Sequence, residues 1–115
     1  MIQELKNRGA DIADALARVL NDTAFYEECV CCFAQDENFS LLEHALNQKE
    51  YNAAFDYVHT LKGVAANLGL LPIFPDLLCM TEALRSKDYQ NILNMENRIK
   101  GAHTWLQALI QNGKS

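Results

Sequence analysis

The sequence predicts an all-α fold, an antiparallel up-down-up-down four-helix bundle with a short extra N-terminal helix. Apolar residues recur three and four positions apart along most of the 115 residues, which is the period of an amphipathic helix. The chain has only two prolines, Pro72 and Pro75, and five glycines, so few positions interrupt a helix. No segment shows the strict alternation and regular turn spacing of a β-sandwich or barrel.

The N-terminal segment predicts short helical pieces packed on one end of the bundle. A first segment runs from Ile2 to about Asn7 and is followed by Gly9 as a break. Asp11 can then cap a short helix. Its inward side is expected to carry Ile12, Leu16, Val19 and Leu20.

The next segment, from about Thr23 to Gln48, predicts one long helix bent near Asp36. Ser40 with Glu43 could instead form a capping box that divides it. We favour the single helix because the apolar stripe keeps its phase. The stripe consists of Phe25, Cys29, Cys32, Phe33, Phe39, Leu42, Ala45 and Leu46.

Three further helices follow, joined by short connections that favour antiparallel neighbours. The first, from about Glu50 to Leu70, has a bundle seam made of Ala54, Val58, Leu61, Ala65 and Leu68. The second, from about Pro75 to Ser86, is expected to bury Leu77, Leu78, Thr81 and Leu84. The third, capped by Asp88 and ending near Gln111, is expected to bury Ile92, Met95, Ile99, Ala102, Leu106 and Leu109.

Composition excludes several classes of function. The net charge is −5, and acidic and basic residues are interleaved, whereas nucleic acids select basic patches. No apolar run approaches the roughly 20 residues of a membrane span, and the N-terminus lacks the apolar core of a signal peptide. We therefore expect a single domain over residues 1–115, in the cytoplasm, with no nucleic-acid partner and no membrane association.

The four cysteines do not predict a disulfide scaffold or a metal centre. Cys29, Cys31 and Cys32 crowd within one helical pattern, and neighbours on a helix rarely satisfy disulfide geometry. Cys29 and Cys32 share a face, but no second pair of Cys or His follows at ligand spacing. We expect reduced thiols that act as small apolar residues, no metal and no cofactor.

Beside the seam of segment 50–70 lies a stripe with reactive chemistry. Residues three and four apart share a helix face, which groups Asn52, Phe55, His59, Lys62, Gly63 and Ala66. A neutral imidazole is a good nucleophile near neutral pH, and Lys62 can neutralise a phosphoryl group beside His59. Gly63 costs roughly 1 kcal/mol in a helix interior; its missing side chain, extended by Ala66, would let another protein approach the nucleophile.

Each of these residues also has a purely structural explanation. Gly63 could mark a close helix–helix contact, and Lys62 could be a solvated charge. His44 and His103 are interpreted as surface or packed histidines, since neither has a neighbouring Lys and Gly in this arrangement. The conjunction in one stripe favours a phosphoacceptor at His59.

The string His59-Thr60-Leu61-Lys62-Gly63-x-Ala65-Ala66-Asn67-Leu68-Gly69 resembles the signature of histidine-containing phosphotransfer domains. A weaker likeness runs from Leu78 to Arg85. The resemblance implies that His59 is phosphorylated and exchanges the phosphoryl group with aspartates of receiver domains, whose own acidic pocket supplies the divalent metal. Lys62 and Gly63 would have the roles argued above.

The resemblance further implies a phosphocarrier in a two-component phosphorelay, not an enzyme, and we expect a monomer. The partners would be response-regulator receiver domains, which could belong to a hybrid histidine kinase. Phe55, Gly63 and Ala66 would lie at the centre of the interface. Family members often have a polar residue on the following helix that hydrogen-bonds the imidazole, and Thr81 or Glu82 could fill that role.

Two other classes of function compete with this hypothesis. A helical adaptor could bind partners through the same surface without phosphorylation, but the intact His-x-x-Lys-Gly motif argues against it. A metal-bearing bundle enzyme would need inward carboxylates and Glu-x-x-His pairs on facing helices, and the sequence has no such pair.

Overall fold

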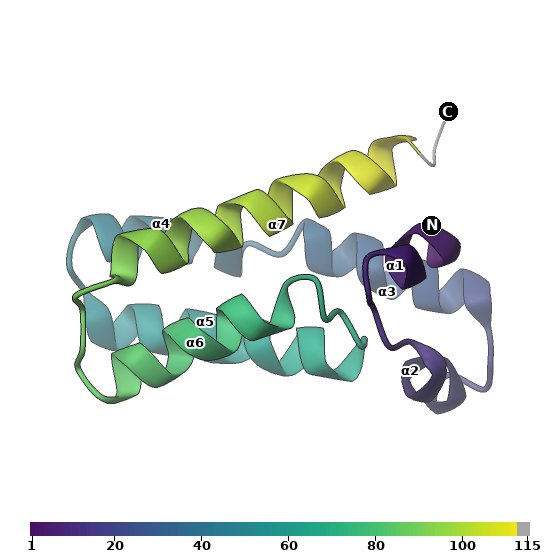
Figure 1. Cartoon of the computed structure of the whole chain (residues 1–115), viewed down its shortest axis with the longest axis horizontal. Helices are drawn as coiled ribbons and strands as arrows, with labels where there is room; N and C mark the ends of the chain where they lie inside the picture. Colours follow the sequence, from purple (N-terminus) through teal and green to yellow (C-terminus); the bar gives the residue numbers. More distant parts are fainter. Residues whose placement is uncertain (113–115) are drawn as a thin grey trace.

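The computed structural model describes residues 1–112, and within them it contains seven helices and no strand (Figure 1). The prediction of an all-α fold is therefore confirmed. The helices are α1 (Ile2–Asn7), α2 (Ala13–Arg18), α3 (Thr23–Ala34), α4 (Asn38–Asn47), α5 (Tyr51–Asn67), α6 (Phe74–Arg85) and α7 (Ile92–Asn112). Helix α5 packs against α4 and α6, and α7 packs against α6 and α3. Short turns join α4 to α5 and α5 to α6, and the directions of these helices alternate in Figure 1.

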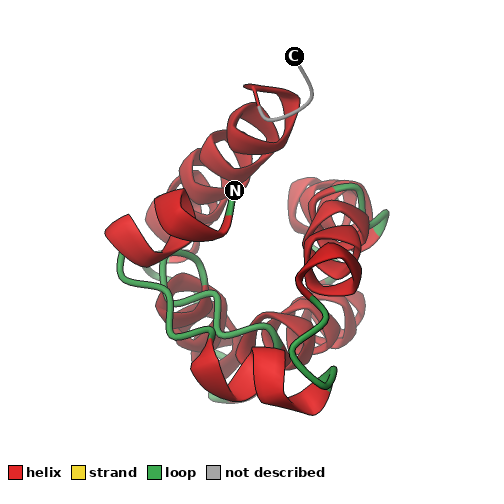
Figure 2. Cartoon of the chain, turned by 90° about the vertical axis from the view of Figure 1, so that its right-hand side faces the viewer, coloured by secondary structure: helices red, strands yellow, loops and turns green. Residues whose placement is uncertain are grey.

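The N-terminal segment forms two short helices, not one, and they lie at one end of the bundle (Figure 2). The prediction of an Asp11 cap was wrong. Helix α2 has no side-chain cap, and the backbone N–H of Asp11 instead donates to the carbonyl of Gly69 at 3.0 Å. Leu20 is 90 % exposed and has a φ of 55°, so it leaves the apolar side of α2 at a left-handed turn.

The predicted long helix over residues 23–48 was also wrong, because the chain breaks between α3 and α4. The Asp36 carboxylate accepts hydrogen bonds from the backbone N–H of Asn38 at 2.8 Å and from its side-chain amide at 2.9 Å. Such local bonds compete with helix continuation. The break lies before Ser40, so the proposed capping box does not cause it.

The break also changes which residues of α3 face the core. Helix α3 buries Tyr26, Val30, Phe33 and Ala34, whereas Phe25 is 48 % exposed and Cys32 is exposed. The stripe predicted through Phe25, Cys29 and Cys32 assumed a phase continuous with α4, and α3 is free to rotate once the helix is interrupted. The α4 part of the stripe was predicted correctly, since α4 buries Phe39, Leu42, Ala45 and Leu46.

The seam of α5 agrees with the prediction at four of its five positions. Ala54, Val58, Leu61 and Ala65 are fully buried, and Leu68 is half-buried. In α6 the predicted inward residue Leu78 is 37 % exposed, and Met80 is buried in its place. Helix α7 begins at Ile92, not at Asp88; the Asp88 carboxylate accepts from the backbone N–H of Gln90 in the preceding turn.

The N-terminal elements hold the carboxyl end of α5. The Tyr26 hydroxyl donates to the carbonyl of Leu68 at 2.6 Å, and the Arg18 guanidinium donates to the carbonyl of Asn67 at 2.6 Å. Burial raises the pKa of Tyr26 to about 12, so its hydroxyl keeps the proton that it donates. Gly69 has a φ of 66°, and a Cβ atom there would lie 1.7 Å from the Asp11 carbonyl oxygen. These contacts fix the helix on which the candidate site lies.

Candidate functional site

His59 lies at the middle of the 17-residue helix α5 and is exposed to solvent. The seam residues Val58 and Leu61 are buried on the neighbouring face of α5, and this helix packs against α4 and α6. The ring of Phe55, one turn earlier, lies beside the imidazole with a centroid distance of 5.6 Å and an interplanar angle of 26°. None of the hydrogen bonds found among residues 1–112 engages the His59 ring. The imidazole is therefore packed on one side and open to an incoming group.

The other stripe residues surround His59 as helical geometry requires. Lys62 is half-buried, while Gly63 and Ala66 are exposed. A Cβ atom built on Gly63 meets no atom within 4 Å. Gly63 therefore does not serve a close helix–helix contact, and the space above it is free. The structure brings together all five residues that the sequence singled out for the site, namely Phe55, His59, Lys62, Gly63 and Ala66.

Helix α6 borders one flank of this stripe. Thr81 is fully buried, and its hydroxyl donates to the carbonyl of Leu77 at 2.7 Å. Glu82 forms an ion pair with Arg85 at 2.6 Å. Both residues considered as partners of the His59 ring thus have other partners.

Sequence reasoning assigned no role to Arg85, although its guanidinium lies over the Phe55 ring at 5.5 Å from the centroid. The spacing of Glu82 and Arg85 indicates an ion pair on one helix. The α5 residue that this pair contacts depends on how α6 packs against α5. The spacing of residues within one helix does not predict that packing.

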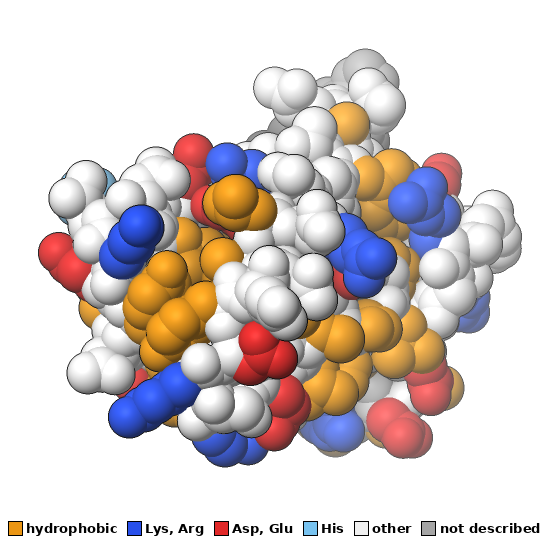
Figure 3. Space-filling model, turned by 60° about the vertical axis from the view of Figure 1, so that its left-hand side comes forward, with side chains coloured by type: hydrophobic (Ala, Val, Ile, Leu, Met, Phe, Trp, Pro, Cys, Tyr) orange, Lys and Arg blue, Asp and Glu red, His pale blue; other side chains and the backbone are white. Residues whose placement is uncertain are grey.

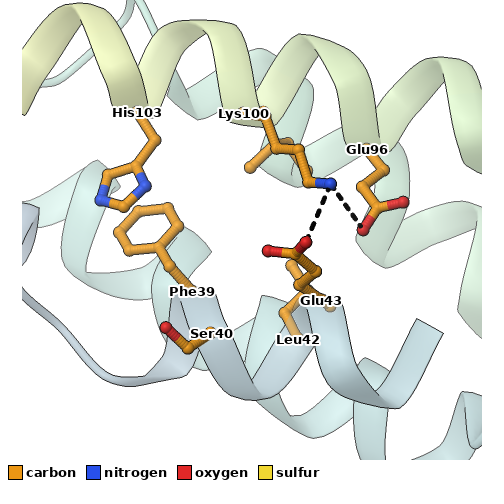
Figure 4. A pocket seen from close by; sticks show the side chains of 8 residues that line it. Phe39, Ser40, Leu42, Glu43, Glu96, Lys100 and His103 are labelled. Carbon is orange, nitrogen blue, oxygen red and sulfur yellow. Dashed lines mark ion pairs between the residues drawn. The ribbon is translucent and has the colours of Figure 1, made fainter. Parts of the chain in front are cut away.

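A second cluster with a histidine lies between α4 and α7 (Figure 4). The His103 ring stacks on Phe39 at a centroid distance of 3.7 Å and an angle of 9°. Its Nε2 lies 2.7 Å from the carbonyl oxygen of Ala34, and a ring nitrogen bonded to a carbonyl must donate its proton. His103 is therefore a packed histidine that joins two helices, and its Nε2 is not available as a nucleophile.

The same cluster lines a cavity of about 90 Å³, and three of the lining residues, Glu43, Glu96 and Lys100, are charged. Lys100 Nζ lies 3.2 Å from Glu43 and 3.8 Å from Oε2 of the buried Glu96 (Figure 4). The hydrogen bond to Glu43 raises the pKa of Lys100. The Glu96 oxygen has no hydrogen-bond partner, because 3.8 Å is an ion-pair distance only. These residues link α4 to α7.

Potential metal ligands and cysteines elsewhere in residues 1–112 form no metal-binding cluster. That part of the chain has no group of three or more His, Cys, Asp or Glu side chains suited to a metal. Its four cysteines are free. The face in Figure 3 carries acidic and basic side chains side by side, with hydrophobic side chains exposed between them. No helix of residues 1–112 is long and apolar enough to cross a membrane.

Comparison with known proteins points to one family. Residues 31–75 match the family model described as the Hpt domain. The matched range contains α4, α5 and the whole string from His59 to Gly69. No curated protein and no solved structure gives a significant match. The match over residues 31–75, together with the all-helical fold, supports a relationship to the Hpt domain family, a family of histidine phosphotransfer domains of two-component phosphorelays.

Proposed function

We propose that His59 is the phosphoacceptor of this Hpt domain. It takes a phosphoryl group from the aspartyl phosphate of one receiver domain and passes it to the aspartate of another. The observation that supports this most strongly is the exposed imidazole of His59 beside the open space at Gly63. A nucleophile that serves another protein's active site has to be reachable by that protein's backbone.

The transfer needs one free ring nitrogen. Its lone pair attacks the phosphorus, an N–P bond forms, and the P–O bond to the aspartate breaks with its electron pair returning to the carboxylate. The other ring nitrogen retains its proton throughout. The reverse sequence phosphorylates the second receiver. In each direction the receiver supplies the acidic pocket and the divalent metal, so the chain acts as a phosphocarrier and not as an enzyme.

The residues around His59 have separate roles in this proposal. Lys62 neutralises part of the phosphoryl charge, which is about −1.5 to −2 near neutral pH if it resembles that of other phosphorylated residues. Phe55 packs beside the imidazole and restricts its orientation. Gly63, which has no side chain, and Ala66, which has a small one, leave space for a receiver to reach His59. Together with Phe55 they form the centre of the receiver interface.

The wider setting belongs to the same proposal. We infer that residues 1–115 act as one domain, as a cytoplasmic monomer, and that the receivers could include that of a hybrid histidine kinase. A helical adaptor that binds receivers without phosphorylation is the alternative. It has no need of an exposed histidine beside Lys62.

The direct test is transfer of labelled phosphoryl from a phosphorylated receiver domain. We expect label on the chain, stable in base and lost in acid, as an N–P bond is. His44→Gln is the matched control, because His44 is an exposed histidine on the neighbouring helix α4. Label that persists in His59→Gln, or label with the opposite stability, would contradict the assignment. Receiver binding without any label would favour the adaptor.

A further inference from the structure

Three side chains form a continuous row that ends at His59. Glu82 Oε1 lies 2.6 Å from a terminal nitrogen of Arg85. The Arg85 guanidinium lies 5.5 Å from the centroid of the Phe55 ring. The Phe55 ring in turn lies 5.6 Å from the His59 ring. A single aromatic ring therefore separates a cation of α6 from the candidate nucleophile of α5.

The contacts that hold Arg85 in this position are weak enough to be exchanged. The Glu82 and Arg85 side chains are both 52 % exposed, and exposed ion pairs contribute little because water screens them. A guanidinium over the face of a phenylalanine is likewise a modest attraction at an exposed site. A dianionic phosphoryl group with three acceptor oxygens is a stronger partner for arginine than a single carboxylate oxygen.

We propose that Arg85 is a second phosphoryl-binding residue, held beside His59 by Phe55 and Glu82 until the phosphoryl group arrives. This proposal rests on the proposed phosphorylation of His59. On phosphorylation, Arg85 leaves Glu82 and donates to a phosphoryl oxygen, while Lys62 approaches from the next turn of α5. No covalent bond changes in this step; the Glu82 carboxylate is released to water.

Glu82 weakens the binding of Arg85 to the phosphoryl group in this arrangement. Its negative charge competes with the phosphoryl group for the same guanidinium, so it limits how strongly Arg85 binds the phosphorylated state. Removing Glu82 should strengthen the contact between Arg85 and the phosphoryl group, and removing Arg85 should make Glu82 irrelevant.

The test uses phosphoramidate as a donor that involves no receiver. The His59 nitrogen forms an N–P bond, the P–N bond of the donor breaks, and ammonia leaves. The pKa of the attached phosphoryl group is then followed by ³¹P NMR across pH, because a nearby cation favours the dianion and lowers that pKa. A merely structural role of Arg85 would not change this titration.

We expect Arg85→Gln to raise the phosphoryl pKa, equivalent to an acid dissociation constant about threefold smaller. Glu82→Gln should lower the pKa, and it should have no effect when combined with Arg85→Gln. Arg98→Gln is the matched control, since Arg98 is an exposed arginine on α7, and it should leave the titration unchanged. Melting curves check that each variant is folded.

Two failures are distinguishable. A wild-type chain that acquires no phosphohistidine overturns the proposed function and this inference with it. A wild-type chain that is labelled on His59, with the same phosphoryl titration in Arg85→Gln, overturns only the role of Arg85.

Discussion

His59 and His103 each pack against a phenylalanine, yet the structure gives their imidazoles opposite surroundings. His103 is half-buried between helices, stacks on Phe39 at 3.7 Å and has its Nε2 on the Ala34 carbonyl. His59 is exposed, and Phe55 contacts it more loosely at 5.6 Å. An aromatic neighbour therefore does not distinguish the two. The difference lies in whether the ring nitrogens are already bonded and whether a partner can reach them.

The neighbouring cations differ in the same sense. Lys100 lies one turn before His103, but it is held between Glu43 and Glu96. The cations near His59 are Lys62 and Arg85, and the ion pair of Arg85 is exposed. Around His103 the charges are used to join α4 to α7, whereas around His59 they remain available to an added anion.

The largest expected effect separates the two histidines by function. His59→Gln should abolish phosphoryl acceptance, because no other residue of the stripe is a comparable nucleophile. Its free energy of unfolding should change by less than about 0.5 kcal/mol, as is usual for exposed positions. Labelling and thermal melting measured on the same sample check both parts. A large loss of stability would show that His59, like His103, has a packing role.

Phe39→Ala should destabilise the packed region around His103. Phe39 is 8 % exposed and packs against both Phe33 and His103, so the truncation should lower the free energy of unfolding by about 3 kcal/mol. His103→Leu keeps an apolar side chain but removes the donor to Ala34, at a cost of about 1 kcal/mol. Urea unfolding measures both. Under conditions where each variant is folded, His59 should still accept phosphoryl; loss of labelling there would couple the two regions.

Gly63→Gln should separate partner docking from stability. Because the space above Gly63 is free, the substitution should raise the free energy of unfolding by about 0.5 kcal/mol through helix propensity. Transfer from a receiver should fall about tenfold, as expected if a contact of about 1.4 kcal/mol is lost. Gly101→Gln is the control, since Gly101 is equally unobstructed on α7, and it should gain stability without affecting transfer. Equal transfer in both variants would remove Gly63 from the interface.

The smallest expected effect concerns Lys62. Lys62→Ala should slow transfer by about threefold, the effect of losing one solvent-screened charge interaction, and the deficit should shrink as salt is added. The exposed Lys6 on α1 gives the control variant Lys6→Ala. Transfer kinetics that are independent of Lys62 at every salt concentration would assign it to the solvated surface.

The sequence by itself determined the helical class and the composition of the His59 stripe. Both depend on the local geometry of one helix, in which residues three and four apart share a face whatever surrounds them. That is why Phe55, His59, Lys62, Gly63 and Ala66 lie together as predicted. The buried seam of α5 follows for the same reason, since its spacing is set within 17 consecutive residues.

Only the tertiary structure decided how the helices face one another. The Asp36 turn interrupts the stripe that the sequence predicts as continuous, and α3 buries Tyr26 and Val30 in place of Cys29 and Cys32. The packing of α6 against α5 left Leu78 exposed, buried Met80 and placed Arg85 over Phe55. The orientation of each helix about its axis is set by the fit of side chains from distant parts of the chain. The apolar pattern within one helix does not determine that fit.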